Sequence, residues 1–159
     1  MKNLVIGQSG GPTAVINASL YGAVKAFRES GADGHVLGMI NGIEGFLADH
    51  VMDLSTDLSD KELELLKLTP AAYLGSCRYK LPADLDSEVY PAIFDNFREM
   101  NIGYFLYVGG NDSMDTVDKL SRYAEKIGSD VKFIGIPKTI DNDLAVSYTH
   151  LTLPTKRIV

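Results

Sequence analysis

Two carboxylates and one amine lie close together in the segment 137–143, which reads PKTIDND. The carboxylate of Asp141 or of Asp143 can accept a proton from an attacking hydroxyl group, as phosphoryl transfer requires. The ammonium group of Lys138 can compensate negative charge that develops on the transferred group. The alternative is an Asx-rich turn, in which the aspartates only hydrogen-bond the local backbone. The segment is therefore a candidate for phosphoryl-transfer chemistry.

A second polar cluster follows a pair of glycines. The residues in order are Gly109, Gly110, Asn111, Asp112 and Ser113. Oxygen atoms of Asn111 and Asp112 are suitable ligands for a hydrated magnesium ion, and the same side chains can crowd a nearby phosphate. The alternative is that Asn111, Asp112 or Ser113 caps the helix that follows. A phosphate or magnesium site and a helix cap are compatible, so the cluster is a candidate for both.

A third candidate is the glycine-rich turn at residues 7–13, which reads GQSGGPT. Its backbone amides are free of bulky side chains and open a helix, and a helix N-terminus favours phosphate through its N–H groups and its dipole. The spacing differs from GxGxxG and from GxxxxGK[ST], which disfavours a dinucleotide-binding Rossmann fold and a P-loop. The alternative is a tight strand-to-helix turn that needs glycine only for its backbone angles.

The elements that must position these turns alternate along the chain. Short apolar runs predict strands at residues 3–6, 36–40, 104–108 and 133–136. Helical spacing predicts four helices, the first with Ile16, Leu20, Val24 and Phe27 on its buried face. The second runs from Ser59 to about Lys67, and the third starts at Ser87 with Val89, Ile93, Phe97 and Met100 on its buried face. The fourth has Val117, Leu120, Ala124 and Ile127 on one face. Gly31 is expected to end the first helix, and Ser59 with Glu62 forms a predicted capping box. Residues 41–46 are predicted to be a loop.

Alternating strands and helices predict an α/β fold of three layers, with a mainly parallel sheet and helices on both faces. Ligands of such sheets bind beyond the carboxyl ends of the strands. The three polar turns each follow a strand, so we expect them to meet at one edge of the sheet.

Composition and charge narrow the classes of protein. The chain has 159 residues, of which 45% are apolar and 23% are charged, as is typical of one globular domain. Its net charge of −6 disfavours non-specific binding of nucleic acid. The single cysteine, Cys77, excludes an intramolecular disulfide, and no apolar run is long enough for a signal peptide or a membrane span. We therefore expect a cytoplasmic protein with no nucleic-acid or membrane partner.

Residues 145–159 break the pattern of the rest, because they contain no acidic residue and no periodicity that suits the neighbouring elements. The codons GTC TCT TAT ACA CAT CTG ACG CTG CCG ACG encode Val146 to Thr155, and this string resembles the end of a transposon-based sequencing adapter. We therefore expect residues 145–159 to be non-native read-through, with the natural sequence interrupted at about Leu144. The alternative is a genuine, divergent tail.

Four motifs occur in a specific order: SGGP at residues 9–12, LGSCR at 74–78, GGNDS at 109–113 and PKTIDND at 137–143. Together they resemble the N-terminal part of a 6-phosphofructokinase, and the resemblance covers residues 1–144. It implies a Rossmann-like N-terminal domain that binds the phosphoryl donor, truncated here because family members are much longer. It also implies that the parent protein phosphorylates fructose 6-phosphate to fructose 1,6-bisphosphate in glycolysis, with Mg²⁺ and as a homo-oligomer.

The resemblance also implies roles for individual residues. Asp141 matches the catalytic base, which takes the proton of the sugar's 1-hydroxyl group, and Lys138 and Asp112 join it as catalytic candidates. Thr139 and Asp143 match substrate-binding positions of the same motif, together with Asp141. The donor-binding candidates are Gly11, Arg78, Gly109, Gly110, Asp112 and Ser113.

Two positions indicate the phosphoryl donor. Family members that use ATP typically carry glycine where this chain has Asp112, because a small residue admits the α-phosphate of the nucleotide. They also typically carry glycine in place of Lys138. Asp112 together with Lys138 resembles the pyrophosphate-dependent members, so diphosphate is the expected donor. Asn111 stands where many relatives have a magnesium-binding aspartate, and a neutral amide is a weaker ligand, which lowers the expectation of a direct metal contact there.

Three alternatives remain open. The first is an ATP-dependent 6-phosphofructokinase that tolerates Asp112. Activity assays of the intact parent protein with ATP and with pyrophosphate would distinguish it from a pyrophosphate-dependent enzyme. The second is a relative of lipid or NAD kinases, in which glycine–glycine–aspartate turns recur, although the segment 137–143 argues against it. The third is an inert fragment that at most binds phosphate, which we expect of the 159-residue chain itself.

Overall fold

The computed structural model of the chain describes residues 2–138, which form a five-stranded sheet with the strand order β3-β2-β1-β4-β5. The strands are β1 (Asn3–Gln8), β2 (Val36–Met39), β3 (Val51–Asp53), β4 (Ile102–Gly109) and β5 (Lys132–Pro137). β1 pairs in parallel with β2 and β4, and β4 pairs in parallel with β5, whereas β3 runs antiparallel to β2. The predicted mainly parallel sheet is therefore confirmed.

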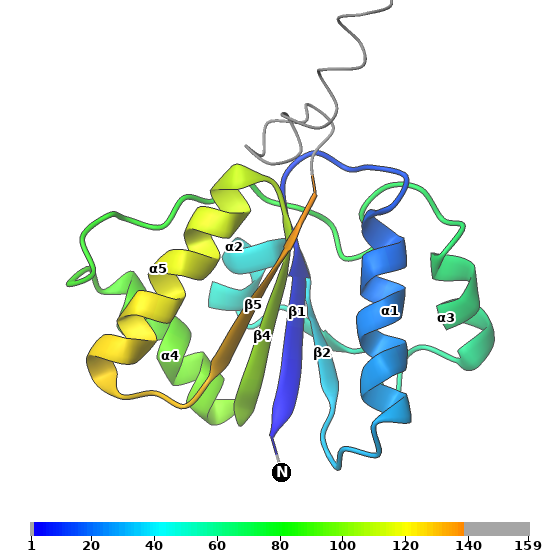
Figure 1. Ribbon diagram of the computed structural model, residues 1–159, viewed down its shortest axis with the longest axis horizontal. Coiled ribbons are helices and arrows are strands. Elements are labelled where there is room, and N and C mark those ends of the chain that lie inside the picture. Colours follow the sequence, from blue (N-terminus) through cyan, green and yellow to red (C-terminus); the bar gives the residue numbers. More distant parts are fainter. Residues whose placement is uncertain (1, 139–159) are drawn as a thin grey trace, which may run out of the picture.

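Helices lie on both faces of this sheet. They are α1 (Ile16–Glu29), α2 (Gly42–Leu47), α3 (Asp60–Leu66), α4 (Val89–Glu99) and α5 (Asn111–Ile127). α1 and α3 lie on one face, and α2, α4 and α5 lie on the other (Figure 1). This arrangement is the three-layer α/β fold that the alternation of elements predicts. Within residues 2–138, no helix combines the length and the hydropathy that a membrane crossing needs.

Two predicted helix ends are confirmed by their local contacts. The backbone N–H of Glu62 donates to Ser59 Oγ over 3.3 Å, and the Glu62 carboxylate accepts from the backbone N–H of Ser59 over 3.0 Å. These reciprocal bonds satisfy two backbone donors that the start of α3 would otherwise leave without a partner. Gly31, just after α1, has a φ of +69°, the left-handed conformation that commonly follows a helix end.

Two short elements differ from the expectation. The prediction of a loop at 41–46 is wrong, because α2 begins at Gly42. Asn41 and Gly42 turn the chain with φ values of 59° and 61°, and the helix then buries Ile43 and Phe46. Such a short, glycine-containing helix depends on tertiary burial, which local propensity does not reveal. β3 was not predicted, since it is 3 residues long and only half-buried.

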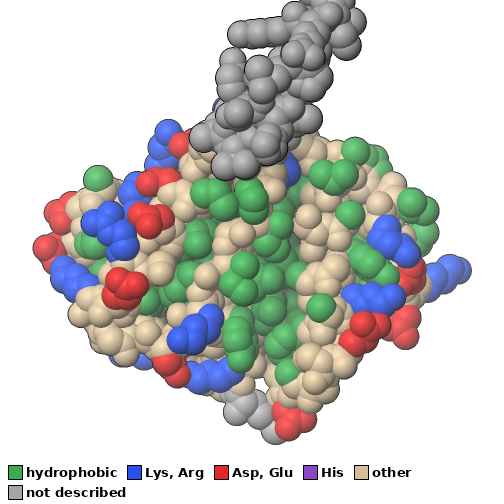
Figure 2. Space-filling view, in the orientation of Figure 1, with side chains coloured by type: hydrophobic (Ala, Val, Ile, Leu, Met, Phe, Trp, Pro, Cys, Tyr) green, Lys and Arg blue, Asp and Glu red, His purple; other side chains and the backbone are tan. Residues whose placement is uncertain are grey.

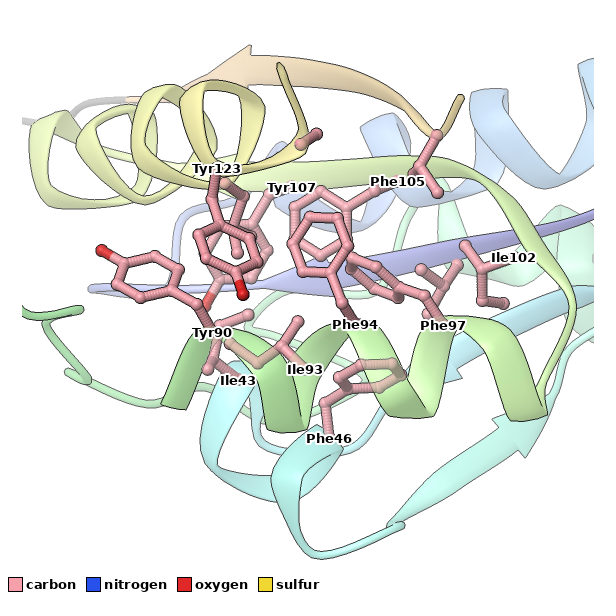
Figure 3. Close-up of a cluster of buried hydrophobic side chains, with 14 of the residues drawn as sticks. Ile43, Phe46, Tyr90, Ile93, Phe94, Phe97, Ile102, Phe105, Tyr107 and Tyr123 are labelled. Carbon is pink, nitrogen blue, oxygen red and sulfur yellow. The ribbon is translucent and has the colours of Figure 1, made fainter. Parts of the chain in front are cut away.

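The core between the sheet and α2, α4 and α5 is largely aromatic (Figure 3). Phe97 of α4 is 2% exposed, as predicted. Its ring centroid lies 5.1–5.6 Å from those of Phe46, Phe94 and Phe105. Aromatic pairs at this spacing contribute stability beyond the burial of their area. Ile127, which was predicted on the buried face of α5, is 49% exposed because it is the last residue of that helix.

The opposite face of the sheet is only partly covered. Leu20 and Val24 of α1 are fully buried against it. Tyr104 on β4 and Ile134 on β5 are 43% and 50% exposed. Figure 2 shows the hydrophobic side chains of this face as a band between α5 and α1.

A long irregular connection, here called the 67–88 segment, joins α3 to α4 without forming a helix or a strand. It runs from one side of the sheet to the other (Figure 1). Irregular stretches of this length are uncommon inside compact domains and are usually functional. The strand ends that this segment approaches are therefore a candidate functional region.

Candidate active site

The carboxyl ends of β1, β4 and β5 bring together the first turn, the second turn and Lys138, the last described residue of the third turn. The backbone N–H of Ser9, just after β1, donates to the carbonyl of Val108 over 2.9 Å. The backbone N–H of Lys138, just after β5, donates to the carbonyl of Gly109 over 2.8 Å. We call this region the turn edge and define it by residues 9–11, residues 109–113 and Lys138.

The side chain of Lys138 reaches across the turn edge to the first turn. Its ammonium group donates a hydrogen bond to the carbonyl of Gly11. It also lies 3.6 Å from the position that a Cβ atom of Gly10 would take. A cation from the end of β5 is therefore held against the glycine turn that follows β1, where it can meet an anionic ligand.

The first turn is not the start of a helix. α1 begins at Ile16, several residues after Gly11, with Pro12 and the residues that follow it in between. The predicted succession of a glycine-rich turn and a helix is present, but the backbone N–H groups at the start of α1 belong to residues after the turn. Gly10 has a φ of +75°, which favours glycine. A Cβ atom at Gly11 would meet no atom of residues 2–138 within 4 Å, so this part of the chain leaves space beside the turn.

The second turn does open a helix. Gly110 has an extended backbone and immediately precedes α5, so Asn111, Asp112 and Ser113 form the first turn of that helix. The capping alternative is wrong, because the N-cap residue is Gly110, which makes no side-chain cap bond. The positive end of the α5 dipole consequently points at the turn edge. The carboxylate of Asp112 is placed at this end, where a negative charge is stabilised.

Gly109 is required by close packing within the turn. A Cβ atom there would lie 2.0 Å from Ser113 Oγ and 3.1 Å from the carbonyl oxygen of Ser9. Ser113 itself is 2% exposed. Its hydroxyl group therefore supports the approach of the second turn to the first, and a larger residue at position 109 would separate them.

The 67–88 segment brings the predicted Arg78 to the same place. Ser76 Oγ donates to the carbonyl of Gly10 over 2.6 Å. The carbonyl of Cys77 accepts from Ser9 Oγ over 3.3 Å and from the backbone N–H of Gly10 over 3.4 Å. Arg78 follows directly and is exposed, so the residue lies next to the contact that Cys77 makes with the first turn.

Cys77 faces inward, away from the turn edge. Its thiol is buried and lies 3.9 Å from the hydroxyl group of Tyr107. Burial raises the pKa of Tyr107, which is therefore a neutral core residue at ordinary pH. The next residue along the segment, Arg78, is exposed.

One residue of the site was missed from the sequence. The ammonium group of Lys80 lies 3.0 Å from a carboxylate oxygen of Asp112. No local pattern marks Lys80, because its contact with Asp112 depends on where the 67–88 segment crosses the turn edge. Three cations, Arg78, Lys80 and Lys138, therefore stand at or beside the turn edge of a chain whose net charge is −6.

The remaining predicted site residues, Thr139, Asp141 and Asp143, lie outside the described residues, as does the predicted tail at 145–159. A metal site is also not formed by the described part of the chain alone. No group of three or more histidine, cysteine, aspartate or glutamate side chains is close enough to hold a metal ion within residues 2–138. Asn111 and Asp112 offer two oxygen-bearing side chains, so a Mg²⁺ ion here would take most of its ligands from phosphate and water.

A hollow of about 630 Å³ lies at the other end of the sheet. Its lining includes Lys2, Phe94, Ile102 and Val131, which lie at or near the amino ends of the strands and on α4. It is therefore separate from the turn edge.

Comparison with known proteins assigns the chain to a family. The family model described as Phosphofructokinase matches residues 3–153. The chain is 43% identical over 148 residues to the pyrophosphate–fructose 6-phosphate 1-phosphotransferase of Halomonas elongata, and 42% identical over 144 residues to the protein of that name from Rhodospirillum rubrum, with 91% of this chain covered in each case. The chain belongs to the phosphofructokinase family.

A solved structure agrees with this assignment. The pyrophosphate-dependent phosphofructokinase of Nitrosospira multiformis superposes with a TM-score of 0.84 at 41% identity, covering 91% of this chain and 35% of that chain. The present chain spans about a third of the length of its curated relatives, 35% and 34% for the two named above.

Proposed function

We propose that the full-length protein carrying this chain phosphorylates fructose 6-phosphate to fructose 1,6-bisphosphate, with pyrophosphate as the phosphoryl donor. The observation that carries this proposal is the charge pattern at the turn edge. The carboxylate of Asp112 stands at the start of α5 with Lys80 beside it, and Lys138 lies over the first turn. The relatives at 42–43% identity are named for the same donor, which supports the proposal.

The choice of donor follows from charge and space. A pyrophosphate has two phosphate groups, which the cations Lys80, Lys138 and Arg78 can neutralise. A nucleotide donor adds an α-phosphate and a base, which need room beyond the second turn. The resemblance places that room at position 112, where this chain carries a carboxylate. The carboxylate of Asp112 has the same sign of charge as a further phosphate and occupies the space that it needs, so Asp112 disfavours ATP.

The proposed chemistry is a direct transfer. Asp141 accepts the proton of the sugar's 1-hydroxyl group, and that oxygen attacks one phosphorus atom of pyrophosphate. The bond to the bridging oxygen breaks, and orthophosphate leaves. Lys138 stabilises the charge that develops on the transferred group, while Thr139 and Asp143 hold the sugar phosphate. A Mg²⁺ ion, when bound with the donor, supplies charge neutralisation.

We also propose a domain role for this chain, and a pathway, a location and an assembly for the full-length protein. Residues 1–144 form the donor-binding part of its N-terminal domain, and residues 145–159 are non-native. The full-length protein acts in glycolysis, in the cytoplasm and as a homo-oligomer. The 159-residue chain alone binds the donor without turnover, since catalysis needs both reactants held in near-attack geometry, an effect of roughly 7–11 kcal/mol.

A donor comparison tests the proposal. A full-length protein carrying this chain is assayed for fructose 1,6-bisphosphate formation with pyrophosphate and with ATP, each with Mg²⁺. Turnover with pyrophosphate and little with ATP is the expected result. Faster turnover with ATP would favour the ATP-dependent alternative, and no product with either donor would contradict the proposed reaction.

A further inference from the structure

Two buried amide side chains, Gln8 and Asn17, hydrogen-bond each other next to the turn edge. Both residues are 0% exposed, and Gln8 Nε2 donates to Asn17 Oδ1 over 2.9 Å. Gln8 is the last residue of β1 and directly precedes Ser9, while Asn17 lies in the first turn of α1. Burying polar groups is costly unless they are hydrogen-bonded, so the hydrogen-bond partners of Gln8 and Asn17 indicate the structural role of the pair.

Those partners are backbone groups of the 67–88 segment. Gln8 Oε1 accepts from the backbone N–H of Leu74 over 2.9 Å. Asn17 Oδ1 accepts from the backbone N–H of Tyr73 over 2.9 Å. Asn17 Nδ2 donates to the carbonyl of Thr69 over 2.9 Å. The pair therefore supplies the hydrogen bonds that a neighbouring strand would supply to a regular segment.

The orientation of both amides follows from the same network. Gln8 Nε2 also donates to the carbonyl of Ile16, over 3.3 Å. Its two donors are thus directed at two acceptors, which leaves its oxygen for the N–H of Leu74. A reversed amide would oppose an NH₂ group to that N–H, so one arrangement is selected.

The held residues lead directly into the part of the segment that reaches the site. Leu74 is bound by Gln8, and Cys77 is bound by the first turn. The chain between these two anchors is short, so its course is set at both ends. Arg78 and Lys80 follow the second anchor, and Lys80 reaches Asp112.

We propose that Gln8 and Asn17 are positioning residues of the donor site. They hold residues 69–74 so that Arg78 and Lys80 stand beside the first turn and Asp112. This inference rests on the proposed function, because it assigns the held segment to donor binding.

The first arm of the test needs no ligand. Trypsin cleavage after Arg78 and Lys80 is followed in the folded 159-residue chain and in the isosteric variants Gln8→Met and Asn17→Leu. Each lost hydrogen bond is worth about 1 kcal/mol, or about fivefold in local opening. Cleavage at these two sites is therefore expected to be about tenfold or more faster, relative to cleavage elsewhere in the chain.

A matched control comes from another amide that joins two elements. Asn96 Nδ2 of α4 donates to the carbonyl of Phe46 in α2 over 2.8 Å, on the aromatic side of the sheet. Asn96→Leu also removes such a bond and lowers stability. Cleavage at Arg78 and Lys80 is expected to keep its wild-type rate relative to other sites in this variant.

The second arm measures pyrophosphate affinity by calorimetry. Gln8→Met and Asn17→Leu are expected to weaken it about fivefold or more, and Asn96→Leu is expected to leave it unchanged. Amide hydrogen exchange of the wild-type chain keeps the test decisive if either isosteric variant does not fold. The N–H groups of Tyr73 and Leu74 should be protected from exchange, and unprotected N–H groups there would overturn the inference.

The outcomes separate this inference from the proposed function. Wild-type cleavage rates in folded variants would overturn the inference, and so would faster cleavage with unchanged pyrophosphate affinity. If the wild-type chain binds no pyrophosphate, the proposed function fails at the donor site, and the positioning role falls with it.

Discussion

The ammonium group of Lys80 lies 3.0 Å from a carboxylate oxygen of Asp112, in the first turn of α5. Both side chains are largely exposed, at 72% and 69%, so the pair adds little to stability. Its consequence is local, because it places a carboxylate and a compensating cation together at the turn edge. A donor with two phosphates can use the cations there, whereas an additional phosphate must approach Asp112.

Changing the two residues that distinguish the donors should change donor use. In the full-length protein, Asp112→Gly combined with Lys138→Gly is expected to raise the ratio of kcat/KM for ATP to that for pyrophosphate by about tenfold or more. The reason is that the charge and the bulk of the Asp112 side chain, which oppose a further phosphate, are removed. Asp118→Gly, which removes a carboxylate farther along α5, is the control. An unchanged ratio in the double variant would contradict the donor assignment.

The proposed general base can be tested by an isosteric change. Asp141→Asn is expected to lower kcat by about two to four orders of magnitude, the usual scale for loss of general-base catalysis. KM for fructose 6-phosphate should change far less, because asparagine keeps the shape of aspartate. Asp143→Asn is the matched variant. Near-normal kcat in Asp141→Asn together with a large loss in Asp143→Asn would transfer the role to Asp143.

Two buried threonine hydroxyls are expected to have opposite effects on stability. Among the described residues, Thr13 Oγ1 is buried without a hydrogen-bond partner, whereas Thr116 Oγ1 donates to the carbonyl of Asp112 over 3.0 Å. Thr13→Val should raise the free energy of unfolding by about 1 kcal/mol, and Thr116→Val should lower it by about the same amount. Urea denaturation measures both. A destabilised Thr13→Val would show that its hydroxyl group has a partner in solution.

The ion pair of Glu64 with Lys67, at the C-terminal end of α3, should make the free energy of unfolding depend on pH. The Lys67 ammonium group, with a hydrogen bond from Tyr21, lowers the pKa of Glu64 from 4.5 to about 2. Because the folded-state pKa is below the unfolded value, the stabilisation is present above pH 4.5 and is lost as the pH falls towards 2. Glu64→Gln should therefore lose less stability than wild type between pH 6 and pH about 2.5.

Glu125→Gln, at an exposed position of α5, is the control for that comparison. It should follow the wild-type dependence on pH. Equal acid sensitivity in wild type and Glu64→Gln would contradict the role of this ion pair.

The sheet was predictable because its parallel strands are short apolar runs that end in glycine or polar turns. Val108 and the glycines after it illustrate this pattern, and so does the run before Pro137. The capping box of Ser59 and Glu62 was predictable as well, since it is a local arrangement. Helix α2 was not predictable, because its glycines have a low helix propensity and the helix is stabilised by the burial of Ile43 and Phe46.

The approach of the first turn, the second turn and Lys138 was also predictable, because parallel neighbours share one carboxyl edge. The contact between Lys80 and Asp112 was not, since it depends on where the 67–88 segment crosses that edge. Bonds between distant residues, such as Leu74 to Gln8, determine this course. No local pattern around Lys80 encodes such a bond.

A binding measurement on the chain tests most directly the claim that the turn edge is a pyrophosphate site. Amide resonances of the ¹⁵N-labelled chain are followed while pyrophosphate or ATP is added with Mg²⁺. The account predicts that the amides of Gly10, Gly11, Gly109 and Gly110 shift with pyrophosphate, at concentrations about tenfold or more below those needed with ATP. Equal or tighter binding of ATP, or pyrophosphate-induced shifts only outside the turn edge, would contradict it.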